Sequence, residues 1–272
     1  MTKNTDAANH FQFGKNWEDY AKLITDERIE LAQKELLRLI PEEQLRGGTF
    51  LDIGCGSGLH AVAASKCGAR DVCASDIDSD SIAAAKHLLV KYCPNSSWKV
   101  ECISVFDMDA GKYHTFDIVY SWGVLHHTGS MYEAFFKAAE MVKSGGLLVI
   151  AVYRKTVFCN FWKAEKFLYK KSPSFVQTII RGFYKLFLLG YLTIRGNNPF
   201  KYLKEYQKNK GISFHHDVHD WLGGYPYESA KPDEVRKFFT DNGFTLEREF
   251  VSKQTFGIFG SGCDEFVFRK KY

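Results

Sequence analysis

Short apolar segments alternate with helix-like segments along most of this chain, and this alternation limits its fold more than any other feature. From residue 49 onward the hydrophobic residues switch repeatedly between the period of a strand and that of a helix. The pattern predicts strands at 49–53, 71–75, 98–103, 116–121 and 146–153, and helices at 59–67, 79–92 and 131–142. Strands joined by helices run parallel, because each crossover returns the chain to the same end of the sheet. The sequence therefore predicts an α/β fold built on a parallel sheet.

Composition divides the rest of the chain into further segments. Residues 1–46 are predicted to form a polar tail, an aromatic turn and a helix over 26–40, and we expect them to act as an N-terminal cap. Residues 47–153 hold the alternating core. Residues 154–228 interrupt it with aromatic, basic, helix-like sequence that ends in a histidine- and aspartate-rich stretch. Residues 229–272 return to the core pattern, with a helix at 232–242 and strands at 244–252 and 265–269.

Global composition excludes several classes of protein. The 272 residues are enough for one large domain, and 45% hydrophobic with 25% charged residues is a globular composition. No apolar run approaches the roughly 20 residues of a membrane-spanning helix, and residues 1–10 lack the apolar stretch of a signal peptide. The seven cysteines form no Cys-x-x-Cys pair, which favours reduced thiols and a cytoplasmic protein.

Charge is distributed unevenly along the chain. The net charge is +4, but residues 154–210 carry 13 Lys and Arg against two acids, Glu165 and Glu205. The remainder holds 23 basic and 30 acidic residues, so an acidic body of net charge −7 carries an insertion of net charge +11. Aromatic residues keep helical spacing within the insertion. Three functions fit this pattern: a helical lid over an active site, a membrane-surface helix pair that delivers a lipid-like substrate, and a grip for nucleic acid.

A glycine-rich turn follows the first core strand, in the motif Asp-x-Gly-x-Gly-x-Gly at 52–58. Glycine permits unusual backbone angles and lets the backbone approach a ligand at the start of the next helix. Asp76 ends the second strand eighteen residues later, where an acid accepts hydrogen bonds from ribose hydroxyls in nucleotide-binding folds. Leu59 takes the place of the last glycine in a dinucleotide fingerprint, and the sequence has no Gly-Lys-Ser/Thr phosphate loop. A nucleoside with a short zwitterionic tail fits these residues better than a pyrophosphate.

Three later motifs extend the pattern until it resembles a known family. They are Ser-Val-Phe-Asp at 104–107, Phe-Asp-Ile-Val-Tyr-Ser-Trp-Gly-Val-Leu-His-His at 116–127, and Leu-Val-Ile at 148–150 after Lys-Ser-Gly-Gly. The set resembles the ordered motifs of class I S-adenosylmethionine-dependent methyltransferases over about 49–153, and more loosely over 232–269. Within that family the residues of these motifs look most like those of small-molecule methylases of the ubiquinone-biosynthesis type. The resemblance implies a Rossmann-like, seven-stranded, mostly parallel sheet with helices on both faces, an N-terminal helical cap and a helical lid insertion.

The resemblance also implies an activity. S-adenosyl-L-methionine would donate its methyl group to an oxygen, nitrogen or carbon of a small organic acceptor, hydrophobic or anionic, and leave as S-adenosyl-L-homocysteine. Because that methyl group is already activated, positioning and desolvation can supply most of the catalysis. Two alternatives stay open: an RNA methyltransferase that uses the basic insertion, and a non-catalytic cofactor-binding partner subunit. The sequence does not indicate an oligomeric state.

Cofactor-binding residues follow from the resemblance, motif by motif. The turn of Gly54, Cys55, Gly56 and Gly58 would hold the methionine moiety with Asp52 near its ammonium group, and Asp76 with Ile77 would hold the ribose. Asp107 would accept a hydrogen bond from the adenine amino group, Met108 would pack beside the ring, and Ser121 and Trp122 would line the reactive end. Trp17 belongs to the aromatic turn that we expect to close over the cofactor.

Candidate catalytic residues come from two histidine-containing stretches. His127 ends the motif at 116–127 and can act as a general base or hold a structural role. The stretch 213–228 crosses the edge of the sheet where substrates bind in such folds; His216 and Asp217 are its candidate bases, and His215, His219, Asp220, Tyr225 and Tyr227 would contact the acceptor. A capping turn with solvated charges explains the same residues, and so does a metal site on one helix face. We assign the stretch to the acceptor, without a bound metal, and keep the two alternatives.

Overall fold

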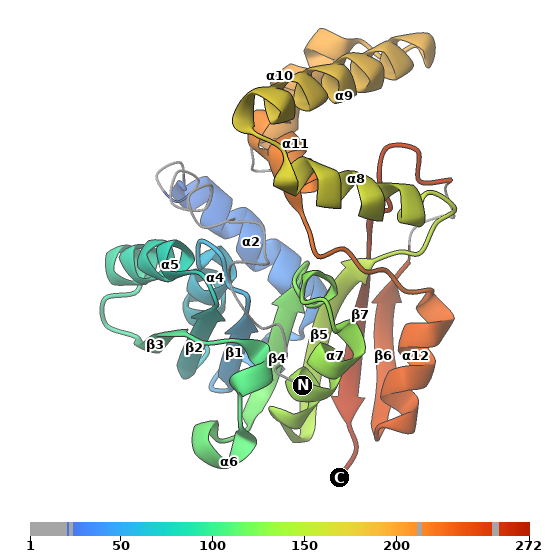
Figure 1. Cartoon of the computed structure of the whole chain (residues 1–272). Coiled ribbons are helices and arrows are strands. Elements are labelled where there is room, and N and C mark those ends of the chain that lie inside the picture. The colour runs from blue at the N-terminus through green and yellow to red at the C-terminus, as the bar shows by residue number, and fades with distance from the viewer. Residues whose placement is uncertain (1–20, 22–23, 211–213, 252–255) are drawn as a thin grey trace.

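The computed structural model describes residues 21, 24–210, 214–251 and 256–272, apart from the side chains of 207–210 and 216. Its centre is one seven-stranded sheet of strand order β3-β2-β1-β4-β5-β7-β6 (Figure 1). The strands are β1 Thr49–Ile53, β2 Asp71–Asp76, β3 Ser97–Cys102, β4 Phe116–Trp122, β5 Val142–Tyr153, β6 Phe244–Phe250 and β7 Cys263–Lys270. The first five run parallel, and β7 is antiparallel to both β5 and β6. The predicted Rossmann-like sheet is confirmed, and the carboxyl ends of β1, β2 and β4 lie at one edge.

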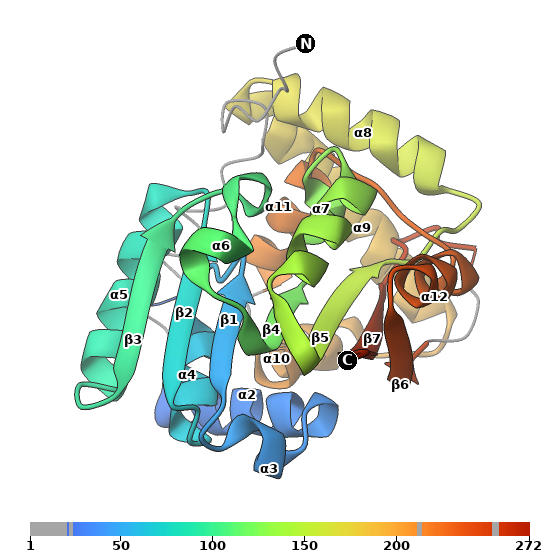
Figure 2. The same ribbon diagram turned by 90° about the horizontal axis from the view of Figure 1, so that it is seen from below.

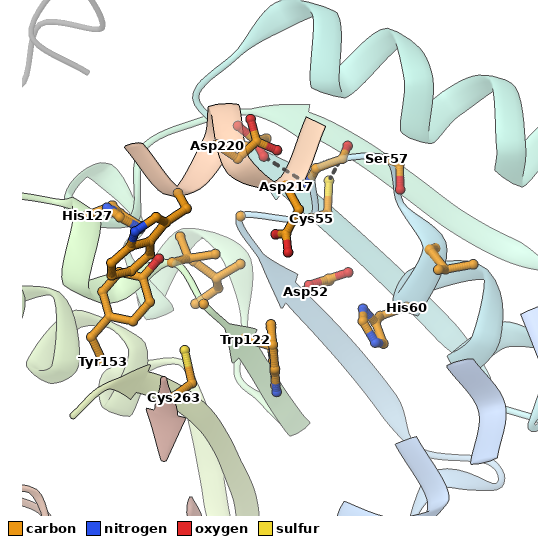
Figure 3. Close-up of a pocket in the computed structure, with 18 of the residues that line it drawn as sticks. Asp52, Cys55, Ser57, His60, Trp122, His127, Tyr153, Asp217, Asp220 and Cys263 are labelled. Atoms are coloured by element: carbon orange, nitrogen blue, oxygen red, sulfur yellow. Dashed lines mark hydrogen bonds between the residues drawn. The ribbon is translucent and has the colours of Figure 1, made fainter. Parts of the chain in front are cut away.

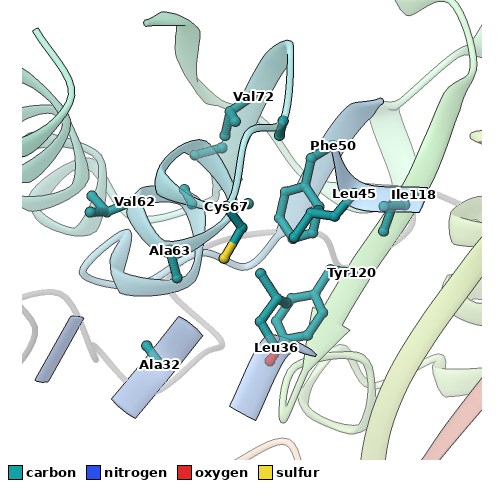
Figure 4. Close-up of a cluster of buried hydrophobic side chains, with 14 of the residues drawn as sticks. Ala32, Leu36, Leu45, Phe50, Val62, Ala63, Cys67, Val72, Ile118 and Tyr120 are labelled. Carbon is teal, nitrogen blue, oxygen red and sulfur yellow. The ribbon is translucent and has the colours of Figure 1, made fainter. Parts of the chain in front are cut away.

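Helices cover both faces of the sheet (Figure 2). One face carries α2 Asp26–Leu39, α4 Leu59–Lys66 and α5 Ser79–Tyr92, and the other carries α7 Met131–Glu140 and α12 Pro232–Asp241. Successive strand residues point to opposite faces, so Phe50 belongs to the core beneath α2 and α4 whereas Leu51 belongs to the core beneath α7. Figure 4 shows the first core, where Leu36 of α2 lies beside Tyr120 of β4. The predicted N-terminal helix is therefore part of the cover of the sheet.

Strand β5 begins four residues earlier than the sequence predicts, because a bulge precedes its regular part. Phe116 pairs with Val142, but Ile118 already pairs with Leu147, so the intervening residues of β5 make an excursion. Lys143 lies in this excursion and donates to both carboxylate oxygens of Asp117 at 2.9 Å. Shorter elements, α3 Glu42–Leu45, α6 Ala110–Tyr113 and single 3₁₀ turns at Val105–Asp107 and Leu125–His127, complete the core.

The insertion forms helices above the edge where the parallel strands end (Figure 1). They are α8 Cys159–Lys171, α9 Ser174–Ile194, α10 Pro199–Lys210 and α11 Phe214–Gly223, and we call residues 154–228 the lid. At the end of β5, buried Arg154 donates from Nε to Asp264 Oδ2 of β7 at 2.8 Å and ties the lid to the sheet. Because α11 spans the histidines and aspartates of the stretch 213–228, these residues lie on a helix, and the capping-turn alternative is wrong. Within the described ranges, none of the helices is long and apolar enough to cross a membrane.

Candidate active site

A cavity of about 1550 Å³ opens at the carboxyl ends of β1, β2 and β4, between the sheet, α2 and the lid (Figure 3). One side of it is lined by the glycine turn and the ends of β1 and β2, and we call this the turn side. The other side is lined by α11, Tyr153 and His127, and we call this the lid side. In Figure 3, Trp122 lies between Asp52 of the turn side and Tyr153 of the lid side. A ligand bound on the turn side and a second ligand bound on the lid side would therefore meet near the end of β4.

The glycine turn has a backbone that suits glycine alone. Gly54 has a φ of +73°, and a Cβ there would lie 2.4 Å from Cγ1 of Val124, so the turn packs against the residues after β4 with no room for a side chain. Gly58, with a φ of +79°, precedes α4, and its Cβ would lie 2.7 Å from that of Ala85 in α5. Residues 54–56 line the cavity, whereas Gly58 is not among the described lining residues. Its neighbours Ser57 and Leu59 do line the cavity, so the assignment of Gly58 to the cofactor stays a prediction. The structure adds that Gly58 permits close packing of α4 on α5.

Two carboxylates face the turn side. Asp52, at the end of β1, is buried, and its Oδ2 has no hydrogen-bond partner in the described structure. Burial and the neighbouring Asp76 raise the pKa of Asp52 to about 8, since both disfavour its negative charge. Asp76 accepts hydrogen bonds from the backbone N–H groups of Gly56 and Asp78, each at 3.0 Å. A cation beside Asp52 would offset this concentration of charge, so the site fits the ammonium group that the resemblance implies.

The wall expected to hold the adenine ring is only partly as predicted. Ile77 and Cys55 line the cavity, as do Ile103 and Phe106 after β3. Ser104 accepts a hydrogen bond from the backbone N–H of Phe106 at 3.3 Å and starts a single 3₁₀ turn. That turn carries Asp107 out to the exposed surface and Met108 into the core, and neither is among the lining residues described. The assignment of Met108 to the adenine ring is corrected, because its side chain packs in the core. Asp107 directly follows the lining residue Phe106, and its assignment to the adenine amino group stays a prediction.

The two residues predicted at the end of β4 differ in their placement. Ser121 is fully buried, donates its hydroxyl to the carbonyl oxygen of Ile53 at 3.0 Å, and does not appear on the described cavity wall. Its cofactor role is corrected: it joins β4 to β1. Trp122 does line the cavity, and its indole N–H donates to Glu265 Oε1 at 2.8 Å. Glu265 also accepts from Arg38 of α2, with both oxygens 2.9 Å from Nη2. These bonds fix the Trp122 ring and the last turn of α2 beside the cavity.

The lid side holds two groups that can take up a proton. Asp217 of α11 lines the cavity and accepts a hydrogen bond from the hydroxyl of Tyr206. His127 lines it from the turn after β4, with Nδ1 2.7 Å from the carbonyl oxygen of Pro226. Because a carbonyl only accepts, this Nδ1 carries a proton, and in the neutral ring Nε2 is left as an acceptor. Asp220 lines the same side, as the sequence predicts.

Helical geometry explains which other residues of α11 reach the cavity. Positions 214, 217, 218 and 221 recur every three or four residues and line it together. His215 and His219 lie on a different face and are not lining residues in the described structure. His215 Nδ1 is 2.6 Å from Nζ of Lys185, and His219 Nδ1 is 2.7 Å from the hydroxyl oxygen of Tyr169. Both assignments to the acceptor are corrected, because one helix cannot turn all of these side chains toward one cavity.

The two tyrosines that follow α11 also lie elsewhere. Tyr225 packs edge-on against the ring of Phe167 in α8. Tyr227 is buried, and its hydroxyl lies 3.3 Å from Sγ of Cys159. Both therefore stabilise the base of the lid, which corrects their assignment as acceptor contacts. The side chain of His216 and the whole of Trp17 lie outside the described residues. The described residues contain no group of three or more His, Cys, Asp and Glu that could hold a metal ion.

The residues that form two walls of the cavity were not predicted from the sequence, although a helical lid over the site was one of the expected functions of the insertion. One is the outer face of α2, which contributes Arg28, Leu31, Glu35 and Arg38. Their spacing of three and four residues follows one helix face, so the sequence already indicated that these side chains point in one direction. The other wall is the inner face of the lid, with Tyr184, Tyr202 and Tyr206. The direction of these tyrosines depends on how the lid helices fold back, which no local pattern shows.

Comparison with known proteins agrees with this geometry. Residues 24–247 match the family model of the methyltransferase domain. The ubiquinone biosynthesis O-methyltransferase of Neisseria meningitidis serogroup C is 29% identical over 132 residues, which are 47% of this chain and 55% of the relative. The tRNA U34 carboxymethyltransferase of Pseudomonas aeruginosa is 31% identical over 115 residues, which are 42% of this chain and 34% of the relative. The chain thus matches about half, or less, of the length of these curated relatives.

A solved structure shares the fold over nearly the whole chain. The magnesium protoporphyrin IX methyltransferase of Synechocystis PCC 6803 with bound S-adenosylhomocysteine superposes with a TM-score of 0.55 and 15% identity, covering 95% of this chain and 96% of that one. At this identity the likeness establishes the fold alone. The family match extends over most of the chain and includes the glycine turn, Asp52 and Asp76. The chain therefore belongs to the methyltransferase-domain family.

Proposed function

We propose that this protein transfers the methyl group of S-adenosyl-L-methionine to a small acceptor on the lid side of the cavity. The observation that carries the proposal is the buried Asp52 carboxylate, whose Oδ2 lacks a partner among the described residues and lies at the glycine turn. An ammonium group there would pair this charge and lower the pKa of Asp52 toward its ordinary range. When bound, the cofactor supplies a methyl group activated by a sulfonium centre.

The turn side offers a separate group for each part of the cofactor. Asp76 uses one oxygen for Gly56 and the other for Asp78, and each oxygen has a further lone pair for a ribose hydroxyl. Ile77, Ile103 and Phe106 form an apolar wall that suits the adenine ring. Residues 54–56 bring backbone close to the methionine portion. The chain thereby fixes the cofactor while leaving the lid side to the acceptor.

The charges on the cavity wall indicate which acceptors fit. The described lining residues include eight Asp and Glu but two Arg, and rings such as Tyr153 and Trp221 line the lid side. An anionic acceptor would meet carboxylates with little compensation, whereas a cationic group would gain from carboxylates and ring faces alike. We therefore favour a neutral or cationic acceptor with an apolar part over the anionic acceptor expected from the sequence.

The lid side can also remove a proton from the acceptor. His127 accepts it at Nε2, because Nδ1–H donates to the carbonyl of Pro226, and this bond stabilises the ring when it becomes positively charged. Asp217 lines the same side, where its carboxylate, held by the hydroxyl of Tyr206, can orient the acceptor. An acceptor that attacks without losing a proton would need positioning alone.

The activity is tested in two steps. Calorimetry of the purified chain with S-adenosyl-L-homocysteine should show binding, and its failure would contradict the whole proposal. Labelled S-adenosyl-L-methionine is then offered with cell fractions of small molecules, lipids, RNA and protein. Label in RNA would contradict the acceptor class while leaving the cofactor assignment intact. We also propose a cytoplasmic location, which the seven free cysteines support.

The roles of His127 and Asp217 are tested with the acceptor identified in this way. His127→Gln and Asp217→Asn should each leave cofactor affinity nearly unchanged. Turnover should fall about 100-fold in His127→Gln if the acceptor loses a proton. His215→Ala is the matched control, because His215 is exposed and lies away from the cavity wall. Unchanged turnover in both cavity variants would remove these residues from the mechanism.

A further inference from the structure

The outer face of the lid carries a feature that methyl transfer does not explain. In the described structure, none of the 21 residues of α9 is buried. Its apolar side chains are widely exposed: Phe183 is 69% exposed, Leu186 71% and Ile194 86%. Further exposed apolar residues are Phe175, Ile179 and Phe187 on the same helix and Phe200 on α10. Soluble domains rarely leave so extended an apolar surface without a binding partner.

The two faces of α9 have different environments. Tyr184 and Leu188 point inward and line the cavity, and the hydroxyl of Tyr184 donates to the carbonyl oxygen of Phe259 at 3.0 Å. Phe175, Ile179, Phe183 and Leu186 recur every three or four residues and form one exposed stripe. Figure 1 shows α9 on the side of the lid that is turned away from the sheet. The stripe is therefore available to a surface outside the molecule.

Several cations of the lid are exposed as well. Residues 154–210 hold 13 Lys and Arg against two acids. Among those with described side chains, none lines the cavity, whereas Lys163, Lys171, Arg195, Lys201 and Lys204 are exposed. The cations are therefore not placed to hold the acceptor or the cofactor. Exposed Arg195 directly follows α9, and exposed Lys201 and Lys204 lie on the neighbouring helix α10 (Figure 1). These cations border the apolar stripe, a combination that matches an anionic surface with an apolar interior.

We propose that the outer face of the lid docks on an anionic lipid surface. The apolar side chains of α9 enter the boundary between headgroups and acyl chains, and the surrounding Lys and Arg approach the lipid phosphates. A second copy of the chain fits less well, because two lids, each of net charge +8, repel each other. Nucleic acid also fits less well, because Ile179 and Leu186, half of the stripe, have no ring on which a base can stack. Docking would place the cavity beneath the inner face of α9 close to the lipid surface.

Flotation with lipid vesicles tests the docking independently of any activity. Wild-type protein should float with vesicles of equal parts phosphatidylcholine and phosphatidylglycerol, and should bind vesicles of phosphatidylcholine alone at least about tenfold more weakly. The double variant Phe183→Ser, Leu186→Ser should lose at least about tenfold in vesicle affinity, since it removes two inserting side chains. Arg195→Glu with Lys204→Glu should lose a similar factor and most of its dependence on salt.

Matched controls separate docking from general effects of the substitutions. Val90→Ser with Phe136→Ser removes two exposed apolar side chains of the core, which are 54% and 47% exposed on α5 and α7, and should float like wild type. All variants should keep the wild-type melting temperature and affinity for S-adenosyl-L-homocysteine. Equal flotation of the lid variants and wild type would overturn the proposal. The proposal would also be overturned if Phe183→Ser, Leu186→Ser floated like wild type but lost an RNA-binding activity of the wild type. The same holds if that variant floated like wild type but lost a self-association seen by gel filtration.

Discussion

Replacing Asp52 with asparagine should make the empty protein more stable and its cofactor binding weaker. The folded chain raises the pKa of Asp52 from its ordinary value of 3.8 to about 8, because the carboxylate is buried beside Asp76. The unfolded chain ionises this group freely, so the unfolding free energy falls as pH rises from about 4 to about 8. The step from 3.8 to about 8 corresponds to at most about 6 kcal/mol.

The expected gain is smaller than this ceiling. A buried asparagine amide that lacks a partner costs about 1–3 kcal/mol. We therefore expect Asp52→Asn to raise the unfolding free energy by about 3 kcal/mol near pH 8 and by close to zero near pH 5. Urea unfolding of the cofactor-free protein at both values measures the difference. If the variant were less stable than wild type near pH 8, the burial of an uncompensated carboxylate would be the wrong explanation.

Cofactor binding should change in the opposite direction. The ammonium group pairs with the ionised carboxylate, so the affinity of wild type should rise about tenfold per pH step up to about 8. The variant should bind about 10–100-fold more weakly near pH 8, because it loses a charge-assisted bond, and should lose the slope with pH. Asp80→Asn is the matched control, since Asp80 lies on the exposed rim of the same cavity. A flat wild-type profile would refute the pairing.

Three further predictions concern the turn, a buried histidine and the base of the lid. Gly54→Ala should destabilise the protein by several kcal/mol and abolish cofactor binding. Gly123 has a similar φ but no described neighbour within 4 Å of the new Cβ, so Gly123→Ala should cost about 1–2 kcal/mol. Chemical denaturation of both variants measures the two losses of stability. Burial holds the pKa of His126 well below 6.5, so stability should fall as pH drops below 6.5, by about 1.4 kcal/mol near pH 5.5, and His126→Asn should remove that part of the fall in urea unfolding. Asp264→Ala should cost about 3–5 kcal/mol by leaving Arg154 buried beside an uncharged residue, and pairing it with Arg154→Met should restore part of the melting temperature.

The parallel core could be predicted because its signals are local. Each strand from 49 to 121 is a short apolar run, and the glycine turn sits directly between a strand and a helix. Gly54 and Asp52 follow from that position, since the end of β1 opens at the cavity. Asp107 shows the limit of such reasoning. Of the motif residues 104–107, the first three line the cavity in the described structure and Asp107 does not. The motif alone does not fix the 3₁₀ turn that separates them.

The stretch 214–223 was predicted less well, although its signal was present. Five ionisable residues in six conceal an apolar period at Phe214, Val218, Trp221 and Leu222, which is that of a helix. Reading it as a helix would have separated Asp217 from His215 and His219 by face. The lid tyrosines are a different case, because the contact of Tyr206 with Asp217 joins separate helices. Such contacts depend on tertiary packing that no short window contains.

The separation of charge within the lid also has a chemical reason. A Lys or Arg on the inner face would lie beside Asp217 or Asp220, hold the carboxylate in an ion pair and compete with a cationic acceptor. Tyr184, Tyr202 and Tyr206 occupy the described inner wall instead, and a tyrosine offers a hydroxyl without a charge near neutral pH. Burial further raises the pKa of Tyr184 and Tyr206, so these rings stay neutral. The lid can thus keep its described cations off the cavity wall and several of them exposed. There an anionic surface can use them without disturbing the carboxylates of the cavity.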